Sequence, residues 1–141
     1  MQNRIIKFRA WDNNKMTYNP IAYDEWTTEC QPLNPVIKSI QNRKEYPQIL
    51  MQFTELLDKN GKEIYERDIV KMFWQHDSVT NFDYEFIGEV EFCCEWGQWQ
   101  VRQESHGEER ALPFHSFERE ELCETEIIGN IFENPELLNL K

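Results

Sequence analysis

The chain has 141 residues, which is the size of one ordinary domain. Of these, 40% are hydrophobic and 13% are aromatic. Intrinsically disordered proteins are poor in Trp, Phe and Tyr, so this composition excludes that class. The chain holds 15 Lys and Arg against 26 Asp and Glu, for a formal net charge of −11. Charge of this sign repels phosphate backbones and anionic lipids, so we expect no direct contact with nucleic acid or membrane.

The first predicted elements form an N-terminal hairpin. In residues 4–12, RIIKFRAWD, side chains alternate between two faces, and Ile6, Phe8 and Ala10 share one of them. DNNK supplies turn residues, and MTYNPIAY is typical of a return strand that Pro20 shortens or confines to an edge. Residues 27–46 contain two prolines in a polar stretch and are predicted to be a connection.

Residues 47–54, PQILMQFT, alternate again and predict a buried strand. DKNG follows, and Asn60 and Gly61 accept a positive φ at low cost, so we predict a purely structural turn there. YERD predicts a second turn. IVKMFW, residues 69–74, then predicts a strand with apolar side chains on both faces.

The longest predicted strand is YEFIGEVEFCCEW, residues 84–96. Its apolar face is expected to hold these side chains: Tyr84, Phe86, Val90, Phe92, Cys94 and Trp96. Its other face is expected to hold the acidic strip, defined as Glu85, Glu89, Glu91 and Glu95. Gly88 predicts a bend or bulge, and Gly97 a reversal into QWQVRQ, which makes an antiparallel hairpin.

The C-terminal part predicts one further strand, TEIIGNIF, and a short helix. In ENPELLNLK, Asn134 can serve as the N-cap and Pro135 as the first helical residue. Several short strands separated by turn signals predict a mainly β protein, built as a small antiparallel barrel or sandwich.

Motifs for chemistry are missing from the sequence. There is no CxxC or HxxxH pair for a metal, no nucleophile elbow and no glycine-rich phosphate loop, so we expect no enzyme, no cofactor and no metal. Cys93 and Cys94 are expected on opposite faces of one strand. No apolar run reaches the length of a membrane helix or a secretion signal, which predicts a cytoplasmic protein with free thiols.

Three blocks of the chain resemble the YopX family of phage and prophage proteins: KFRAWD with Met16 close behind, LMQFTELLDKNGKEIYERDIV, and EIIGNIFENPELL. The chain departs from the family pattern at Glu55 and Arg67, where the family usually has glycine. If those glycines hold positive φ, Glu55 and Arg67 adopt strained backbone.

The resemblance implies an SH3-like barrel in residues 47–141, preceded by a hairpin and connecting segment in residues 1–46, the two packing as one unit. It also implies a bacterial cell that carries a phage or prophage. It implies no activity and no catalytic residue.

Three functional hypotheses remain open. The first is a non-enzymatic phage accessory protein that acts through protein contacts, with Trp26 as a contact residue, and it includes a homo-oligomer. The second is a nucleic-acid mimic that inhibits a host DNA-binding or defence protein, because alternate residues of the acidic strip lie about 6.6 Å apart, close to phosphate spacing. The third is an enzyme in which His115, Cys123 and a carboxylate converge.

Overall fold

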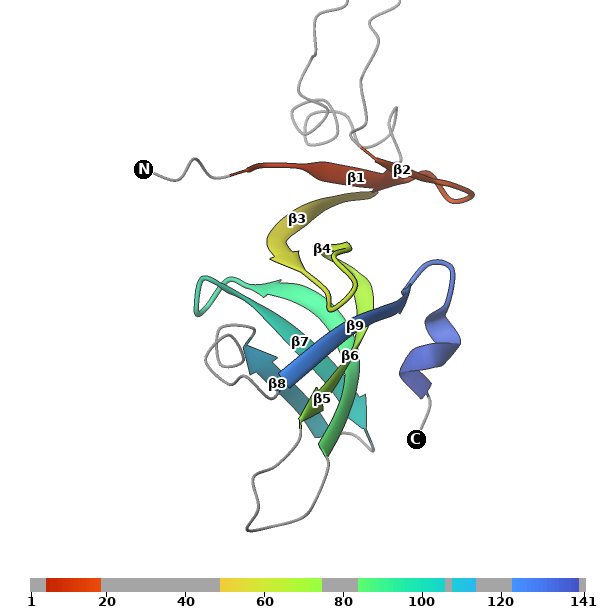
Figure 1. The fold of residues 1–141 in the computed structure, drawn as a ribbon. Helices are drawn as coiled ribbons and strands as arrows, with labels where there is room; N and C mark the ends of the chain where they lie inside the picture. The colour runs from red at the N-terminus through yellow and green to blue at the C-terminus, as the bar shows by residue number, and fades with distance from the viewer. Residues whose placement is uncertain (1–4, 19–48, 75–83, 106–107, 114–122, 140–141) are drawn as a thin grey trace, which may run out of the picture. The chain divides into compact units, whose positions relative to one another are not determined.

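The computed structural model describes residues 5–18, 49–74, 84–105, 108–113 and 123–139, and these are almost entirely β structure (Figure 1). Two sheets are present, with strand orders β2-β1-β3-β4 and β8-β7-β6-β5-β9. The chain divides into two compact units, Met1–Phe53 and Thr54–Lys141. The prediction of a mainly β protein is therefore confirmed. The predicted division after residue 46 falls outside the described residues and stays a prediction.

In the first unit, the predicted N-terminal hairpin is present. β1 (Phe8–Trp11) pairs antiparallel with β2 (Met16–Tyr18). The turn between them is held by Asp12, whose Oδ1 accepts the backbone N–H of Lys15 at 2.9 Å. β1 also pairs with the start of β3 (Ile49–Leu57). The alternation that predicted these strands thus yields a small antiparallel sheet.

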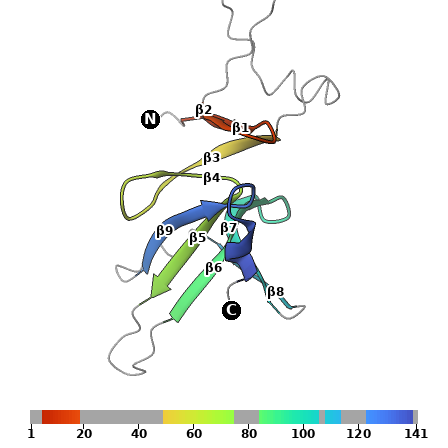
Figure 2. The ribbon, with the colours of Figure 1, turned by 90° about the vertical axis from the view of Figure 1, so that its right-hand side faces the viewer.

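The second unit is a five-stranded sheet that curls into a half-barrel (Figure 1). The short strand β4 (Glu63–Tyr65) precedes this sheet in the chain and is not part of it. The five strands of the sheet are β5 (Asp68–Trp74), β6 (Tyr84–Cys93), β7 (Gln98–Ser105), β8 (Glu108–Pro113) and β9 (Cys123–Asn130). Strands β5 to β8 follow one another as a meander, and β9 returns to pair with β5. Figure 2 shows β9, β5 and β6 side by side.

The core of the second unit comes from alternate positions on these strands. Its buried residues are Ile64, Val70, Met72, Phe86, Val90 and Val101. Leu56, Trp99, Leu112 and Ile127 pack against them. Period-2 alternation places Val70 with Met72 on one strand, and Phe86 with Val90 on the next, on the same side of the sheet. The apolar face predicted for the middle of β6 is therefore the face that builds the core.

Gly88 permits the close approach of β6 and β7. A Cβ at this position would lie 2.5 Å from the carbonyl oxygen of Arg102 and 2.8 Å from Cγ1 of Val101. Contacts this short do not occur between real atoms, so only glycine fits here. The bend predicted at Gly88 corresponds to a point where the curled sheet leaves no room for a side chain.

The predicted C-terminal helix is a short 3-10 helix, η2 (Pro135–Asn139), and the described residues contain no α-helix. The backbone N–H of Leu137 donates to the carbonyl of Asn134 at 3.1 Å, an i to i+3 bond. Five residues are too few to stabilise a regular α-helix, and 3-10 bonds are common in such short pieces. The position of the helix was predicted correctly, but its type is 3-10.

The two departures from the family pattern adopt left-handed backbone. Glu55 has φ 70° and Arg67 has φ 69°, a region that non-glycine residues rarely occupy. Arg67 is held on both sides: its N–H donates to the carbonyl of Val90 at 2.9 Å, and its carbonyl accepts from Ile131 at 3.1 Å. The predicted strain at Glu55 and Arg67 is confirmed, and at Arg67 the neighbouring backbone fixes it.

Candidate functional site

The β6–β7 hairpin ends in a four-residue turn, residues 94–97, which we call the hairpin tip together with Phe92 and Cys93 at its base. The N–H of Gly97 donates to the carbonyl of Cys93 at 2.8 Å and closes the turn. Gly97 has φ 64°, and nothing lies within 4 Å of the Cβ it lacks. Glycine is therefore favoured at this position by backbone conformation and not by crowding.

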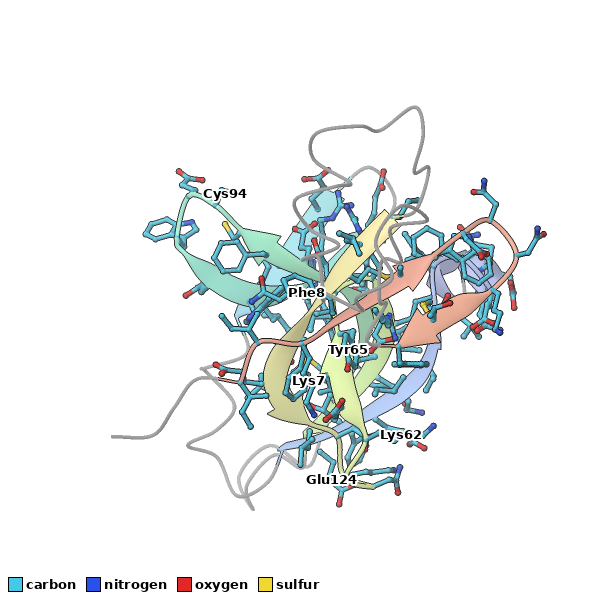
Figure 3. All side chains as sticks on the ribbon, turned by 90° about the horizontal axis from the view of Figure 1, so that it is seen from above. Lys7, Phe8, Lys62, Tyr65, Cys94 and Glu124 are labelled. Carbon is cyan, nitrogen blue, oxygen red and sulfur yellow. The ribbon has the colours of Figure 1, made fainter. Side chains whose placement is uncertain are left out.

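The hairpin tip exposes aromatic surface that the sequence assigned to the core. Trp96 is 72% exposed, the largest fraction among the exposed large hydrophobic side chains of the described residues, and Phe92 is 43% exposed. Cys94 is also exposed and lies at the outer end of the hairpin (Figure 3). The prediction that Cys94 and Trp96 share the apolar face is wrong, because the chain leaves the sheet after Cys93. The turn-forming Gly97 directly after Trp96 was the signal available for this.

A ring contact at the base anchors the hairpin tip to the core. Phe92 and Trp99 are partners across β6 and β7, and their rings meet edge to face with centroids 5.1 Å apart at 74°. Trp99 is half-buried and packs against the core of the second unit. The exposed part of the tip thus stands on a packed aromatic pair.

The charge beside Trp96 is negative and has no cationic partner among the described residues. Glu95 is exposed, and the described residues place no cationic side chain at ion-pair distance from its carboxylate. Glu91 differs, since its Oε2 lies 3.1 Å from Nε of Arg102 and its Oε1 accepts from Nε2 of Gln100 at 2.7 Å. Glu95 is therefore the carboxylate at the tip that this part of the chain does not neutralise.

The rest of the acidic strip is engaged in ion pairs. Glu85 lies 2.8 Å from Nζ of Lys71 on the adjacent strand. Glu89 is only 7% exposed and binds Nη1 of Arg67, while Nη2 of Arg102 lies 3.8 Å from it. The hydrogen bond that the Arg67 guanidinium donates to Glu89 raises the pKa of Arg67. The structure brings the four glutamates onto one hairpin but does not present them as a uniform row of free charges.

The turn that contains Asn60 and Gly61 is organised around Asp58, and we call residues 58–62 the docked turn. Oδ1 of Asp58 accepts the N–H groups of Asn60 at 2.8 Å and Lys62 at 2.9 Å, and its Oδ2 accepts the N–H of Ile127 at 3.2 Å. Burial raises the pKa of Asp58, but the backbone hydrogen bonds outweigh it and the pKa is lowered. Gly61 has φ 79°.

Lys59 attaches the docked turn to the edge of β9. Its N–H donates to the carbonyl of Thr125 at 2.8 Å, and its Nζ lies 2.7 Å from Glu126 and 4.0 Å from Glu124. Figure 3 shows Lys62 of this turn and Glu124 of β9 at the same end of the sheet. The groups of this turn are used within the fold, so we assign it no site.

The side chains of the remaining predicted residues, Trp26, His115 and Cys123, are not among those that the structure describes. Trp26 falls in residues 19–48 and His115 in residues 114–122, and of Cys123 only the backbone is described, as the first residue of β9. Within the described ranges, no group of three or more His, Cys, Asp or Glu side chains could hold a metal ion. Convergence of His115 and Cys123 with a carboxylate stays a prediction.

The comparison with protein-family models gives one decisive result. A model described as YopX protein matches residues 7–139, nearly the whole chain. The chain belongs to the YopX family. The resemblance that the three sequence blocks carry is therefore confirmed. Among curated proteins, none matches the chain.

The chain is similar to solved structures. The chain is similar to protein yopX from Bacillus subtilis, with 22% identity, a TM-score of 0.54, and coverage of 96% of this chain and 98% of that one. At this identity the likeness shows a common fold. Protein EF1440 from Enterococcus faecalis matches with 25% identity and a TM-score of 0.45, over 96% of this chain and 99% of that one.

Within the described ranges, no helix has the length and apolar character needed to cross a bilayer.

Proposed function

We propose that this YopX-family protein acts without catalysis, as a phage or prophage accessory protein that binds another protein through the hairpin tip. The observation that carries the proposal is the 72% exposure of Trp96 on a turn closed by its own backbone. Tryptophan is among the residues that contribute most at protein interfaces. Burial of such a ring contributes about 3 kcal/mol before ordering costs are subtracted.

The base of the hairpin tip favours binding because it reduces those ordering costs. The Phe92–Trp99 ring contact and the Gly97 to Cys93 hydrogen bond hold the turn in one conformation. A surface that is already ordered loses less conformational entropy when a partner binds. An exposed indole on such a turn is therefore better suited to recognition than one on a flexible loop.

We further propose that the half-barrel is part of an SH3-like barrel. The meander β5 to β8, with β9 returning to pair with β5, supports this assignment. Small barrels of this kind often present turns as contact surfaces, although fold analogy alone does not define a function. An experimental structure in which the strands do not close further than the half-barrel would contradict the assignment.

The charge distribution favours protein contact over nucleic-acid mimicry. Glu89 is buried against Arg67, and Glu85 and Glu91 have cationic partners. A phosphate mimic needs carboxylates that are free and exposed in a row. Within the acidic strip, Glu95 is exposed and has no cationic partner among the described residues, but a single free carboxylate does not make such a row.

Site-specific photo-crosslinking in the bacterial host tests the proposal. A photoreactive residue replaces Cys94 and leaves Trp96 intact, and a matched variant carries Trp96→Ala in addition. We expect one defined adduct that is lost in the matched variant. The purified partner should then bind the wild-type chain at least tenfold more tightly than Trp96→Ala. No adduct, or an adduct that Trp96→Ala leaves unchanged, would contradict the proposal.

A further inference from the structure

Resting on this proposed function, we infer that the partner presents a basic segment whose arginine side chain stacks on the indole of Trp96 and pairs with the carboxylate of Glu95. The inference concerns the chemistry of the partner at the hairpin tip. It follows from the distribution of cations along the chain, from the ion pairs of the sheet, and from the energetic consequence of covering Trp96.

The sequence around the hairpin tip contains no Lys or Arg. No Lys or Arg occurs between Lys71 and Arg102, a stretch that includes all of β6, the hairpin tip and the start of β7. The same stretch contains the whole acidic strip. From the start of β6 to residue 101 of β7, the chain therefore offers the hairpin tip no Lys or Arg.

The second step is that the cations flanking this stretch are already engaged. Lys71 is paired with Glu85 at 2.8 Å. Arg102 lies 3.1 Å from Glu91 and 3.7 Å from Glu109. To reach Glu95, either side chain would have to give up the carboxylates that it now contacts. The counter-charge for Glu95 must therefore come from outside the hairpin.

The third step concerns what any partner does when it covers Trp96. Glu95 is the neighbouring residue in the same four-residue turn and is exposed like Trp96, so we expect a protein that covers the turn to remove water from the carboxylate as well as from the indole. An ionised carboxylate that loses water without gaining a partner is strongly destabilised. A purely apolar surface is thus disfavoured, and a phosphate-bearing surface is repelled.

A cation satisfies both side chains at once. A guanidinium or ammonium over an indole face contributes about 0.5–1 kcal/mol at exposed sites and about 2 or more when water is excluded. Arginine is favoured over lysine because its planar group stacks on the ring while its N–H groups still reach a carboxylate. The formal net charge of −11 adds a long-range attraction for a basic segment.

The test uses the full-length chain, labelled with nitrogen-15, and follows the indole N–H signals during titration with short capped peptides. The probes are tetra-arginine, tetra-lysine and tetra-glutamate amides. Loss of one signal in Trp96→Phe assigns the Trp96 resonance. We expect a saturable shift of that resonance with tetra-arginine, weaker binding of tetra-lysine and none of tetra-glutamate. Added salt should weaken the binding.

Two matched acid variants separate a local site from a diffuse charge effect. Glu95→Gln should weaken tetra-arginine binding at least threefold. Glu104→Gln removes an exposed carboxylate from β7, away from the turn, and should leave binding unchanged within error. Equal effects of both variants, or no saturable shift of the Trp96 signal at millimolar peptide, would overturn the inference.

The outcome is distinguishable from failure of the proposed function. If tetra-arginine does not bind but the photo-adduct still depends on Trp96, the tip contacts a partner of other chemistry and only this inference fails. If the adduct does not depend on Trp96, the proposed function fails as well.

Discussion

Two turns of the second unit differ in what their polar and apolar groups contact. In the docked turn, residues 58–62, Asp58 and Lys59 bind backbone and side chains of β9. In the hairpin tip, the backbone closes the turn, but Trp96 and Glu95 point to solvent. Similar reversals of the chain thus have different consequences. The first turn stabilises the fold, and the second is available to another molecule.

Among substitutions in these two turns, the largest expected loss of stability follows from removing the Asp58 side chain. Asp58→Ala removes the acceptor for the N–H groups of Asn60, Lys62 and Ile127. Hydrogen bonds to charged groups contribute about 1.5–3 kcal/mol each, and some of these N–H groups can turn to water instead. We expect the free energy of unfolding to fall by about 3 kcal/mol in urea denaturation. A loss below about 1 kcal/mol would mean that this turn is not held as the structure shows.

The pH dependence of Asp58 gives the next effect. Its pKa is lowered from 3.8, so its folded carboxylate contributes stability that is fully present above the unfolded value. This contribution is lost as the pH falls through the lowered pKa. We therefore expect the stability difference between wild type and Asp58→Asn to be constant above about pH 5 and to shrink below pH 3.8. Urea denaturation of both proteins from pH 2.5 to 7 measures it, and a difference that grows on acidification would reverse the assigned sign.

A substitution in the backbone of the hairpin tip, Gly97→Ala, is expected to have the next largest effect on stability. Gly97→Ala meets no atom within 4 Å but places a side chain at φ 64°. Such a substitution costs about 1 kcal/mol through backbone strain alone. Thermal unfolding should show that modest loss. Because the turn that presents Trp96 is altered, the Trp96-dependent photo-adduct should also weaken. An unchanged adduct would mean that the turn conformation does not matter for binding.

The sequence predicted local features of the fold well because they depend on neighbouring residues. Alternation identified β1, β3 and β6, and the replacement of family glycines predicted the left-handed backbone of Glu55 and Arg67. Those inferences need only the geometry of a strand or of one residue.

Of the candidate site, Glu95 was expected as a contact residue in the acidic strip, but the exposure of Trp96 and the ion pairs of the other glutamates were not predicted, for two physical reasons. Cys94 and Trp96 continue the period of β6, so alternation cannot show that the strand has ended at Cys93. The ion pairs of the acidic strip depend on which strands lie side by side, as does the bond from Ile127 to Asp58, which joins residues 69 apart. Pairing across strands is decided by the whole fold, and no local pattern reports it.

The smallest expected loss of stability is that of Trp96→Ala, and it decides whether the Trp96 indole is a contact surface or part of the core. Trp96→Ala removes a side chain that is 72% exposed, so the protein should lose less than about 0.5 kcal/mol of stability. Binding of the partner should nevertheless fall at least tenfold. Phe86→Ala is the contrasting control, since Phe86 is 1% exposed and its truncation should cost about 3–4 kcal/mol. If Trp96→Ala destabilised the protein as strongly as Phe86→Ala, the indole would be part of the core in solution. The difference between the two turns would then disappear, because both would serve the fold alone.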